Sequence, residues 1–175
     1  MAVAIFNTDT VVGEAVAETI DGGGGGIRLK ARFSVLPPGP HGFHIHKAGD
    51  LRGEGCAGAC DHWHVGPAGV RHGPAPGPTS NKDRHTGDLG NVVAGETYTY
   101  VLRGVRVSDL WGRTLIVHAD EDDLGHGTHE DSGTTGHSGL RIGCAVFGRV
   151  ATCGASKKSH KRVRYAYRFT RKRRN

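Results

Sequence analysis

Two histidines alternate with apolar residues in the stretch GFHIHKAGD, residues 42–50. Side chains two positions apart on a β-strand point to the same face, so we expect His44 and His46 to project together and Ile45 to face the other way. Two imidazoles on one rigid strand make half of a four-nitrogen metal site, and tetragonal nitrogen geometry favours Cu(II). An isolated pair more often marks exposed strand histidines, so this interpretation requires further ligands.

Further candidate ligands follow along the chain. RHTGDLGN places His85 and Asp88 three residues apart in a glycine-rich turn, and a His and an Asp with two more nitrogens complete a tetrahedral zinc site. TLIVHADEDDLG ends a β-branched run on His118 and continues into an acidic loop. The stretch CDHWHVGPAGVRHG adds three more candidates, which are His62, His64 and His72. Eleven of the twelve histidines lie between His41 and His137, and histidine is the commonest metal ligand in proteins.

These residues need rigid elements, and the hydrophobic pattern predicts strands. Residues 27–35 alternate strictly between apolar and polar side chains, which is typical of a half-buried antiparallel strand. We expect further strands at 3–6, 11–20, 41–47, 96–107, 113–119 and 140–150. The high glycine count of 29 and the low aromatic content of 6% argue against a helical bundle. Several short strands without a convincing helix indicate a β-sandwich or small barrel.

Two long stretches, 47–92 and 119–139, show no strand pattern and are rich in Gly, Asp and His. Long loops without regular structure inside a compact domain are usually functional. We therefore expect most of the site to come from these two loops.

Four motifs together resemble the sequential motifs of copper/zinc superoxide dismutase: GFHIHKAGD, RHTGDLGN, RTLIVHADEDDLG and GLRIGCAVFG. They occur in the family's order and at compatible spacing, and the resemblance covers residues 1 to about 150. It implies an all-β Greek-key β-sandwich or barrel of about eight antiparallel strands with two long functional loops. It also implies an enzyme that converts superoxide to oxygen and hydrogen peroxide by Cu(II)/Cu(I) cycling. The alternative is a dismutase-like metal-binding or copper-delivery module without turnover, but such modules typically lose copper ligands that are present here.

The resemblance implies a ligand set for each metal, with one shared histidine. The copper ligands fall on His44, His46, the shared histidine and His118, and the zinc ligands on the shared histidine, His72, His85 and Asp88. Two candidates exist for the shared position, because the chain from Cys56 to His72 is two residues longer than usual. His62 has the family's spacing from Cys56, and His64 has its spacing from His72. We favour His62, because the half-cystine fixes that end of the loop, and we assign it a catalytic role.

Other roles also follow from the resemblance. Asp122 matches the carboxylate that links a copper-bound to a zinc-bound histidine, and Arg141 matches the catalytic arginine beside the copper. Cys56 and Cys144 match the family's disulfide, whereas Cys60 and Cys153 have no counterpart. The loop residues that guide superoxide fall on Glu130, Asp131 and Thr135, but Thr134 stands where a lysine is usual. His126, His129 and His137 receive no role.

The charge is divided between two segments. Residues 157–175 carry ten Lys or Arg and no acid, while the rest of the chain holds 13 basic and 17 acidic side chains, a balance of −4. We expect a dismutase domain at 1–153 and a disordered basic tail at 154–175 that contacts polyanions such as nucleic acid or a membrane surface. The resemblance also implies a homodimer. The N-terminus lacks the pattern of a signal peptide and no apolar run approaches about 20 residues, so we expect a cytoplasmic protein, with nuclear targeting by the tail as an option.

Overall fold

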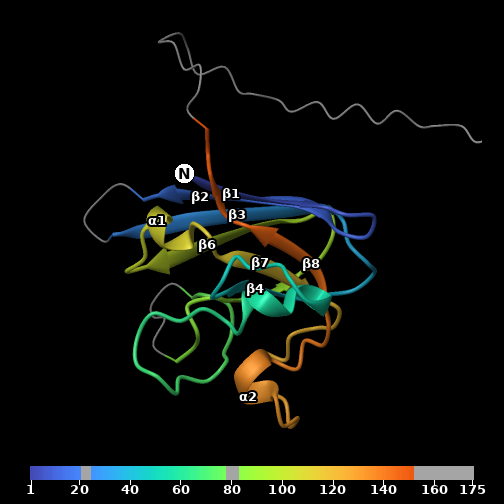
Figure 1. The fold of residues 1–175 in the computed structure, drawn as a ribbon. Coiled ribbons are helices and arrows are strands. Elements are labelled where there is room, and N and C mark those ends of the chain that lie inside the picture. The colour runs from blue at the N-terminus through green and yellow to red at the C-terminus, as the bar shows by residue number, and fades with distance from the viewer. Residues whose placement is uncertain (21–24, 78–82, 152–175) are drawn as a thin grey trace, which may run out of the picture.

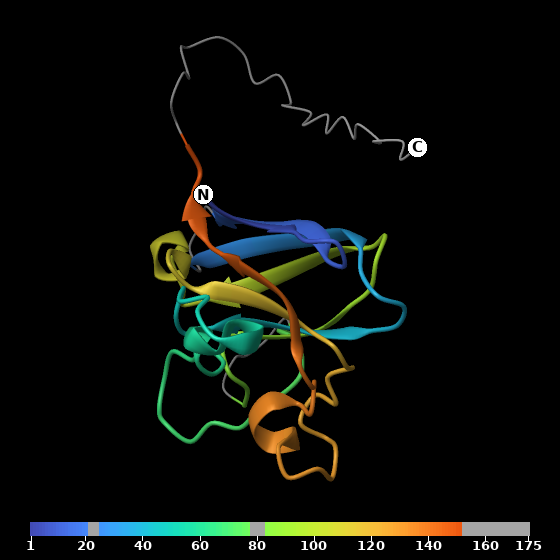
Figure 2. The same ribbon diagram turned by 45° about the vertical axis from the view of Figure 1, so that its right-hand side comes forward.

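The computed structural model describes residues 1–20, 25–77 and 83–151, and these form two antiparallel sheets of nine strands in all. The first sheet has the order β6-β3-β2-β1-β9 and comprises β1 (Ala2–Asn7), β2 (Val12–Thr19), β3 (Gly26–Val35), β6 (Thr97–Arg103) and β9 (Gly148–Arg149). The second has the order β5-β4-β7-β8 and comprises β4 (His41–His46), β5 (Asp88–Val92), β7 (Thr114–His118) and β8 (Arg141–Val146). The predicted all-β sandwich is confirmed, and Figures 1 and 2 show its two layers.

The connections cross between the sheets. Strands β3 and β6 are hydrogen-bonded neighbours, although β4 and β5 of the other sheet separate them along the chain. Strands β4 and β7 are likewise neighbours separated by β5 and β6. Such crossovers are typical of Greek-key sandwiches. They bring the motifs at 42–50 and 113–119 onto adjacent strands.

Three of the buried phenylalanine rings pack against one another in the core between the sheets. Phe33 of β3 lies 5.3 Å from Phe6 of β1 and 5.4 Å from Phe43 of β4, measured between ring centroids. Each such pair contributes about 0.5–1.5 kcal/mol beyond area burial. The alternation predicted for residues 27–35 holds from Ile27 to Phe33, whose apolar members are buried, but Val35 is 41% exposed because the strand ends there. The packed core gives the second sheet a rigid base for side chains on its outer face.

Three expected element boundaries were wrong. Strand β5 lies inside the stretch 47–92. Its buried apolar residues, Leu89 and Val92, are three positions apart, so they do not show the period of two that indicates a strand. The strand expected at 96–107 ends at Arg103, since Gly104 adopts a left-handed conformation with φ of 69°. The strand expected at 140–150 divides into β8 and β9, which belong to different sheets.

Short helices occupy the connections. They are a 3-10 helix η1 (Glu54–Ala59) and two single turns of α-helix, α1 (Val107–Leu110) and α2 (Ser132–Thr135). None of the helices in the described residues is long and apolar enough to span a membrane. The long connections that carry η1 and α2 lie on the outer side of the second sheet, away from β1, β2 and β3 (Figures 1 and 2). The basic tail and Cys153 lie outside the described residues, so the proposed domain boundary stays a prediction.

Candidate metal centre

Strands β4 and β7 place three histidines on one face of the second sheet. In the antiparallel register His44 lies opposite Ile116 and His46 opposite Thr114, and residues directly opposite each other point to the same side. His118 follows Ile116 by two positions and therefore shares that face. Ile45 points the other way into the core, as the sequence predicted.

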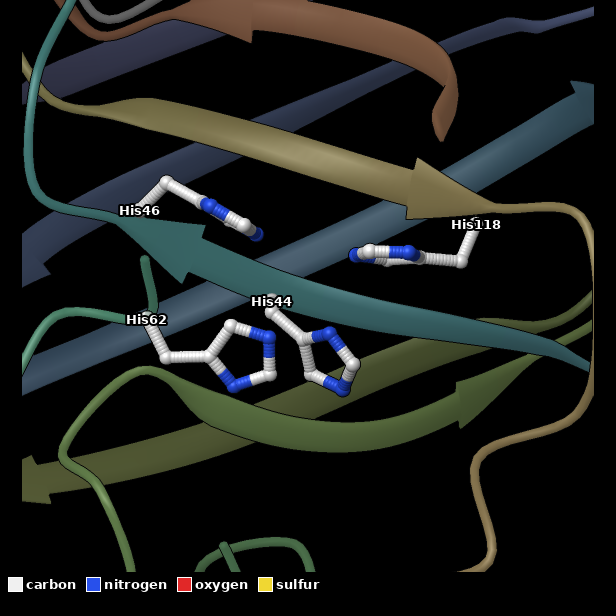
Figure 3. A group of neighbouring side chains, drawn as sticks. All are labelled: His44, His46, His62 and His118. Atoms are coloured by element: carbon white, nitrogen blue, oxygen red, sulfur yellow. The ribbon is translucent and has the colours of Figure 1, made fainter. Parts of the chain in front are cut away.

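The fourth histidine reaches the same face through a short pairing with the end of β4. His62 forms an isolated antiparallel bridge with His46, and the Trp63 N–H donates to the Ile45 carbonyl oxygen at 2.8 Å. Gly87 completes the arrangement, because its N–H donates to the Trp63 oxygen at 2.8 Å and its own oxygen accepts from the Ile45 N–H at 2.9 Å. A side chain at Gly87 would place its Cβ 2.2 Å from the Ile45 oxygen, so only glycine fits. Figure 3 shows the four histidines gathered around one region of β4.

Each of these four rings has one nitrogen engaged and one nitrogen without a hydrogen-bond partner among the described residues. The engaged nitrogens each donate one hydrogen bond: His44 to Asp122 Oδ2 (2.9 Å), His46 to the Cys60 oxygen (2.7 Å), His62 to Asp88 Oδ1 (2.8 Å) and His118 to the Gly139 oxygen (3.2 Å). The other nitrogens are all buried: His44 Nδ1, His46 Nε2, His62 Nε2 and His118 Nε2. The four residues can present ligand atoms that all lie within 4.8 Å of one another. Metal-binding histidines typically have one nitrogen anchored in this way, so the set fits copper.

A second group surrounds Asp88. Its Oδ1 lies 2.8 Å from His62 Nδ1, 3.0 Å from His72 Nδ1 and 3.3 Å from His85 Nδ1. Its Oδ2 accepts hydrogen bonds from the backbone N–H groups of His85 at 2.8 Å and Gly73 at 3.1 Å. Three imidazoles and one carboxylate within 4.8 Å match the ligand chemistry of a closed zinc site.

His62 belongs to both groups, through opposite nitrogens of one ring. Its Nδ1 faces Asp88, and its Nε2 is a free nitrogen of the first group. His64, the other candidate for the shared position, belongs to neither group. It is half-buried, and its Nδ1 lies 3.5 Å from Thr86 Oγ1.

Burial sets the charge of the first group. It lowers the pKa of His46 to about 2 and that of His118 to about 4, with repulsion from neighbouring histidines adding to the effect. Burial likewise holds the pKa of His44 well below its usual value. These rings are therefore neutral near pH 7, which leaves nitrogen lone pairs available to a metal ion.

The second group has the opposite electrostatics. Burial alone would lower the pKa of His72, but the hydrogen bonds that its ring donates to Asp122 and Asp88 outweigh burial and raise the pKa to about 9. Burial alone would raise the pKa of Asp88, but hydrogen bonds from His62, His72 and His85 lower it far below the usual range. The carboxylate is therefore charged, and a cation that binds here would displace the proton of His72.

The comparisons with known proteins agree with this chemistry. The family model for copper/zinc superoxide dismutase matches residues 11–147. The chain belongs to the copper/zinc superoxide dismutase family. The copper-zinc superoxide dismutase of Paramecium bursaria Chlorella virus 1 is 43% identical over 130 residues, which cover 70% of this chain and 66% of the viral protein. A crystal structure of the clock protein EA4 has 32% identity and a TM-score of 0.68, and the match covers 84% of this chain and 92% of that one.

Asp122 joins the two groups of this dismutase-family chain. It is buried, and it accepts hydrogen bonds from His44 Nε2 at 2.9 Å and from His72 Nε2 at 2.8 Å. Asn91 holds its backbone, because the Asn91 side chain accepts from the Asp122 N–H at 2.7 Å and donates to the Asp122 oxygen at 2.8 Å. Asn91 is the last residue of the motif RHTGDLGN, but no feature of the sequence indicated this role. Gly136 also matters here, since a Cβ at that position would lie 2.0 Å from Asp122 Oδ1.

Arg141 stands at the start of β8, opposite His118 in the register. Its Nη1 donates to the Cys56 oxygen at 2.9 Å and its Nη2 to the Cys60 oxygen at 2.7 Å. The disulfide predicted between Cys56 and Cys144 is confirmed, and it ties η1 to β8. The Cys60 oxygen also accepts from His46 Nδ1, so this carbonyl positions both a histidine of the first group and the arginine. Sequence reasoning missed that role, since a backbone carbonyl carries no residue signature.

The loop at 119–139 forms α2 above this sheet, and the residues matched to substrate guidance lie around it. Thr135 Oγ1 lies 3.2 Å from Asp131 Oδ2, and Glu130 is exposed. The structure adds a cation that the sequence analysis did not single out. The Arg71 guanidinium lies where a side chain at Gly133 would be, with Nη2 2.5 Å from the position of a Cβ there. Arg71 therefore adjoins Thr134, the position where a lysine is usual.

Proposed function

We propose that this chain is a superoxide dismutase, an oxidoreductase that converts two superoxide anions and two protons into dioxygen and hydrogen peroxide. We assign His44, His46, His62 and His118 to copper, and His62, His72, His85 and Asp88 to zinc. The observation that carries this proposal is the membership of His62 in both groups. When bound, copper supplies a one-electron acceptor and donor, and zinc supplies a fixed positive charge beside it.

The protein's own residues bind the anion and handle protons. Arg141 uses two of its five N–H donors on backbone carbonyls, which fixes the guanidinium and leaves the others for a small anion. His62 Nε2 is a buried nitrogen that can accept a proton in one half-reaction and release it to peroxide in the other. Asp122 keeps His44 and His72 in fixed orientations, so that the metal-binding nitrogens face their ions.

The test is a copper titration of zinc-loaded protein, followed by a superoxide-removal assay. We expect activity to rise in proportion to bound copper and to reach a maximum near one copper per chain. Saturation with copper without any gain in superoxide removal would instead favour the metal-buffering or copper-delivery alternative. A chain that binds no copper at the four-histidine group would contradict both readings.

We expect Arg71 to assist substrate capture. Replacing it with glutamine should lower kcat/KM about 2- to 3-fold at low ionic strength, because a cation beside the loop matched to substrate guidance is lost. The difference in kcat/KM between the variant and the unmodified protein should disappear at high salt. Lys30→Gln is the matched control, since Lys30 is exposed on β3 of the other sheet. Equal effects of the two variants, or an effect that salt leaves unchanged, would show that Arg71 has no steering role.

We also propose a homodimer, formed through an apolar patch of Leu51, Trp111 and Val150, which are 43%, 37% and 36% exposed. Chain segments next to these residues lie close together: a Cβ at Gly49 would lie 2.4 Å from the Gly112 oxygen, and the Arg149 guanidinium stacks on Trp111 at 4.3 Å. Solvent-exposed apolar patches often mark protein–protein interfaces.

The dimer is tested by substituting Leu51→Glu. We expect sedimentation equilibrium to show a weaker dimer by tenfold or more, an energetic effect of about 1.4 kcal/mol, because the charge must be desolvated at the interface. Val35→Glu serves as the control, since Val35 is similarly exposed at the opposite end of the first sheet. A monomeric unmodified protein, or equal effects of both variants, would rule out this interface.

We propose that residues 157–175 contact polyanions, supported by their ten Lys or Arg and absence of acids. Removing them should abolish retention on heparin or DNA at low salt, because counterion release from each neutralised phosphate drives such binding. Unchanged retention of the shortened chain would refute this proposal.

We also propose a cytoplasmic location with tail-dependent entry into the nucleus, which fluorescent fusions with and without the tail would test.

A further inference from the structure

Two histidines outside both metal groups stack on each other beside α2. The rings of His129 and His137 lie 3.6 Å apart between centroids, and their planes differ by 6°. Both residues are exposed. Neither contacts the histidines of the four-histidine group or of the Asp88 group, so the dismutase chemistry does not account for them.

The backbone around α2 brings these two residues together. At the start of the turn the His129 N–H donates to Ser132 Oγ at 3.1 Å, and the Ser132 N–H donates to the His129 oxygen at 3.1 Å. At its end Gly136 adopts a left-handed conformation with φ of 70°, and His137 follows with φ of 51°. The chain thereby reverses direction within eight residues and returns His137 to the side of His129. A left-handed conformation costs a non-glycine residue roughly 1–2 kcal/mol, so the contacts around the turn hold the pair together.

The acidic neighbours give the pair the character of a cation site. His137 Nδ1 donates to Asp131 Oδ1 at 2.7 Å, which leaves Nε2 of His137 with a lone pair directed away from the carboxylate. A carboxylate behind an imidazole in this way orients metal-binding histidines and raises their basicity. An open hollow of about 580 Å³ adjoins the pair and is lined by His129, Glu130, Asp131, Thr134 and His137.

We propose that His129 and His137 bind a third transition-metal ion at this hollow, with Glu130 as an oxygen ligand and Asp131 as the carboxylate that orients His137. Imidazole ligands suit copper, zinc and nickel, and among divalent ions of the first row Cu(II) binds such sites most tightly. The stacked rings are nearly parallel, so both side chains must rotate out of the stack before one nitrogen of each can face the same ion. Both side chains are exposed, which gives them room for this rotation. The site is thus open to solvent, unlike the two buried groups at the sheet.

The test counts Cu(II) on full-length protein that already holds one copper and one zinc per chain. Equilibrium dialysis against Cu(II), read by metal analysis and by electron paramagnetic resonance, should show one further Cu(II) with nitrogen ligands. The double variant H129N/H137N should weaken this binding by about 100-fold or more, since losing even a supporting partner of a metal ligand costs about 10–100-fold. Each single variant should weaken it about tenfold.

His126→Asn is the matched control, because His126 is an exposed histidine of the same loop that does not line the hollow. This variant should bind the additional Cu(II) as the unmodified protein does. Thermal unfolding midpoints of the loaded variants would show that the exposed substitutions leave the fold intact. Binding that persists in the double variant, or no additional Cu(II) on the unmodified protein, would overturn the proposal.

Discussion

Replacing His62 with alanine should lower the rate of superoxide removal by more than about 100-fold in protein loaded with copper and zinc. The reason is that, within the described part of the chain, this ring alone belongs to both groups, through Nε2 on one side and Nδ1 beside Asp88 on the other. Alanine would remove a ligand from each metal and the nitrogen that we assign to proton transfer. Stopped-flow measurement of superoxide decay, with metal content determined on the same sample, would check the prediction.

The matched control for this prediction is His64→Ala. His64 lies only two residues away, yet it belongs to neither group, so its loss should leave the rate within about twofold of the unmodified value. The pair of variants also decides which of the two histidines is shared by the metals. If H64A lost as much activity as H62A, the assignment of the shared ligand would be wrong.

The second large effect concerns the disulfide between Cys56 and Cys144. Cys144→Ser should reduce the free energy of unfolding by roughly 4–5 kcal/mol, because the bond closes a loop across a sequence separation of 88 residues. Activity should fall as well, since Arg141 donates to the Cys56 oxygen and loses a fixed partner when η1 is released from β8. Urea unfolding of metal-loaded protein and parallel rate measurements would test both parts.

The control for this effect is Cys60→Ser. Cys60 is exposed and free, so the substitution removes a thiol without opening a covalent loop. We expect a change within about 0.5 kcal/mol, as for most exposed positions. A similar loss of stability in the two variants would show that the disulfide is not the source of the effect.

The family, the sandwich fold and most of the candidate ligands could be predicted from the sequence alone. His44 and His46 were predicted to share a strand face because the period of a β-strand is two, and that rule is local. The alternation through β3 likewise predicted which side chains face the core. These conclusions needed only the spacing of neighbouring residues and four motifs in a fixed order.

The remaining features depend on contacts between distant segments, and these contacts form only when the chain folds. Spacing left His62 and His64 both open, because an insertion makes a count from either end ambiguous. The folded chain distinguishes the two, because His62 forms a bridge with His46 and Gly87 lies close to Ile45. No local sequence pattern encodes these two contacts. Strand β5 was not predicted because Leu89 and Val92, its apolar residues, are three positions apart and do not fit the period of a strand.

The positioning role of the Cys60 carbonyl and the location of Arg71 beside Gly133 likewise arose only from folding. A backbone carbonyl that serves both His46 and Arg141 has no sequence signature, since every residue carries the same group. Arg71 comes to lie against Gly133 because the His72 N–H donates to the Gly133 oxygen at 2.8 Å across the two long loops. Residue types and local periods can be read along the chain, whereas partners on separate strands and loops are chosen only when the sheets and loops pack together.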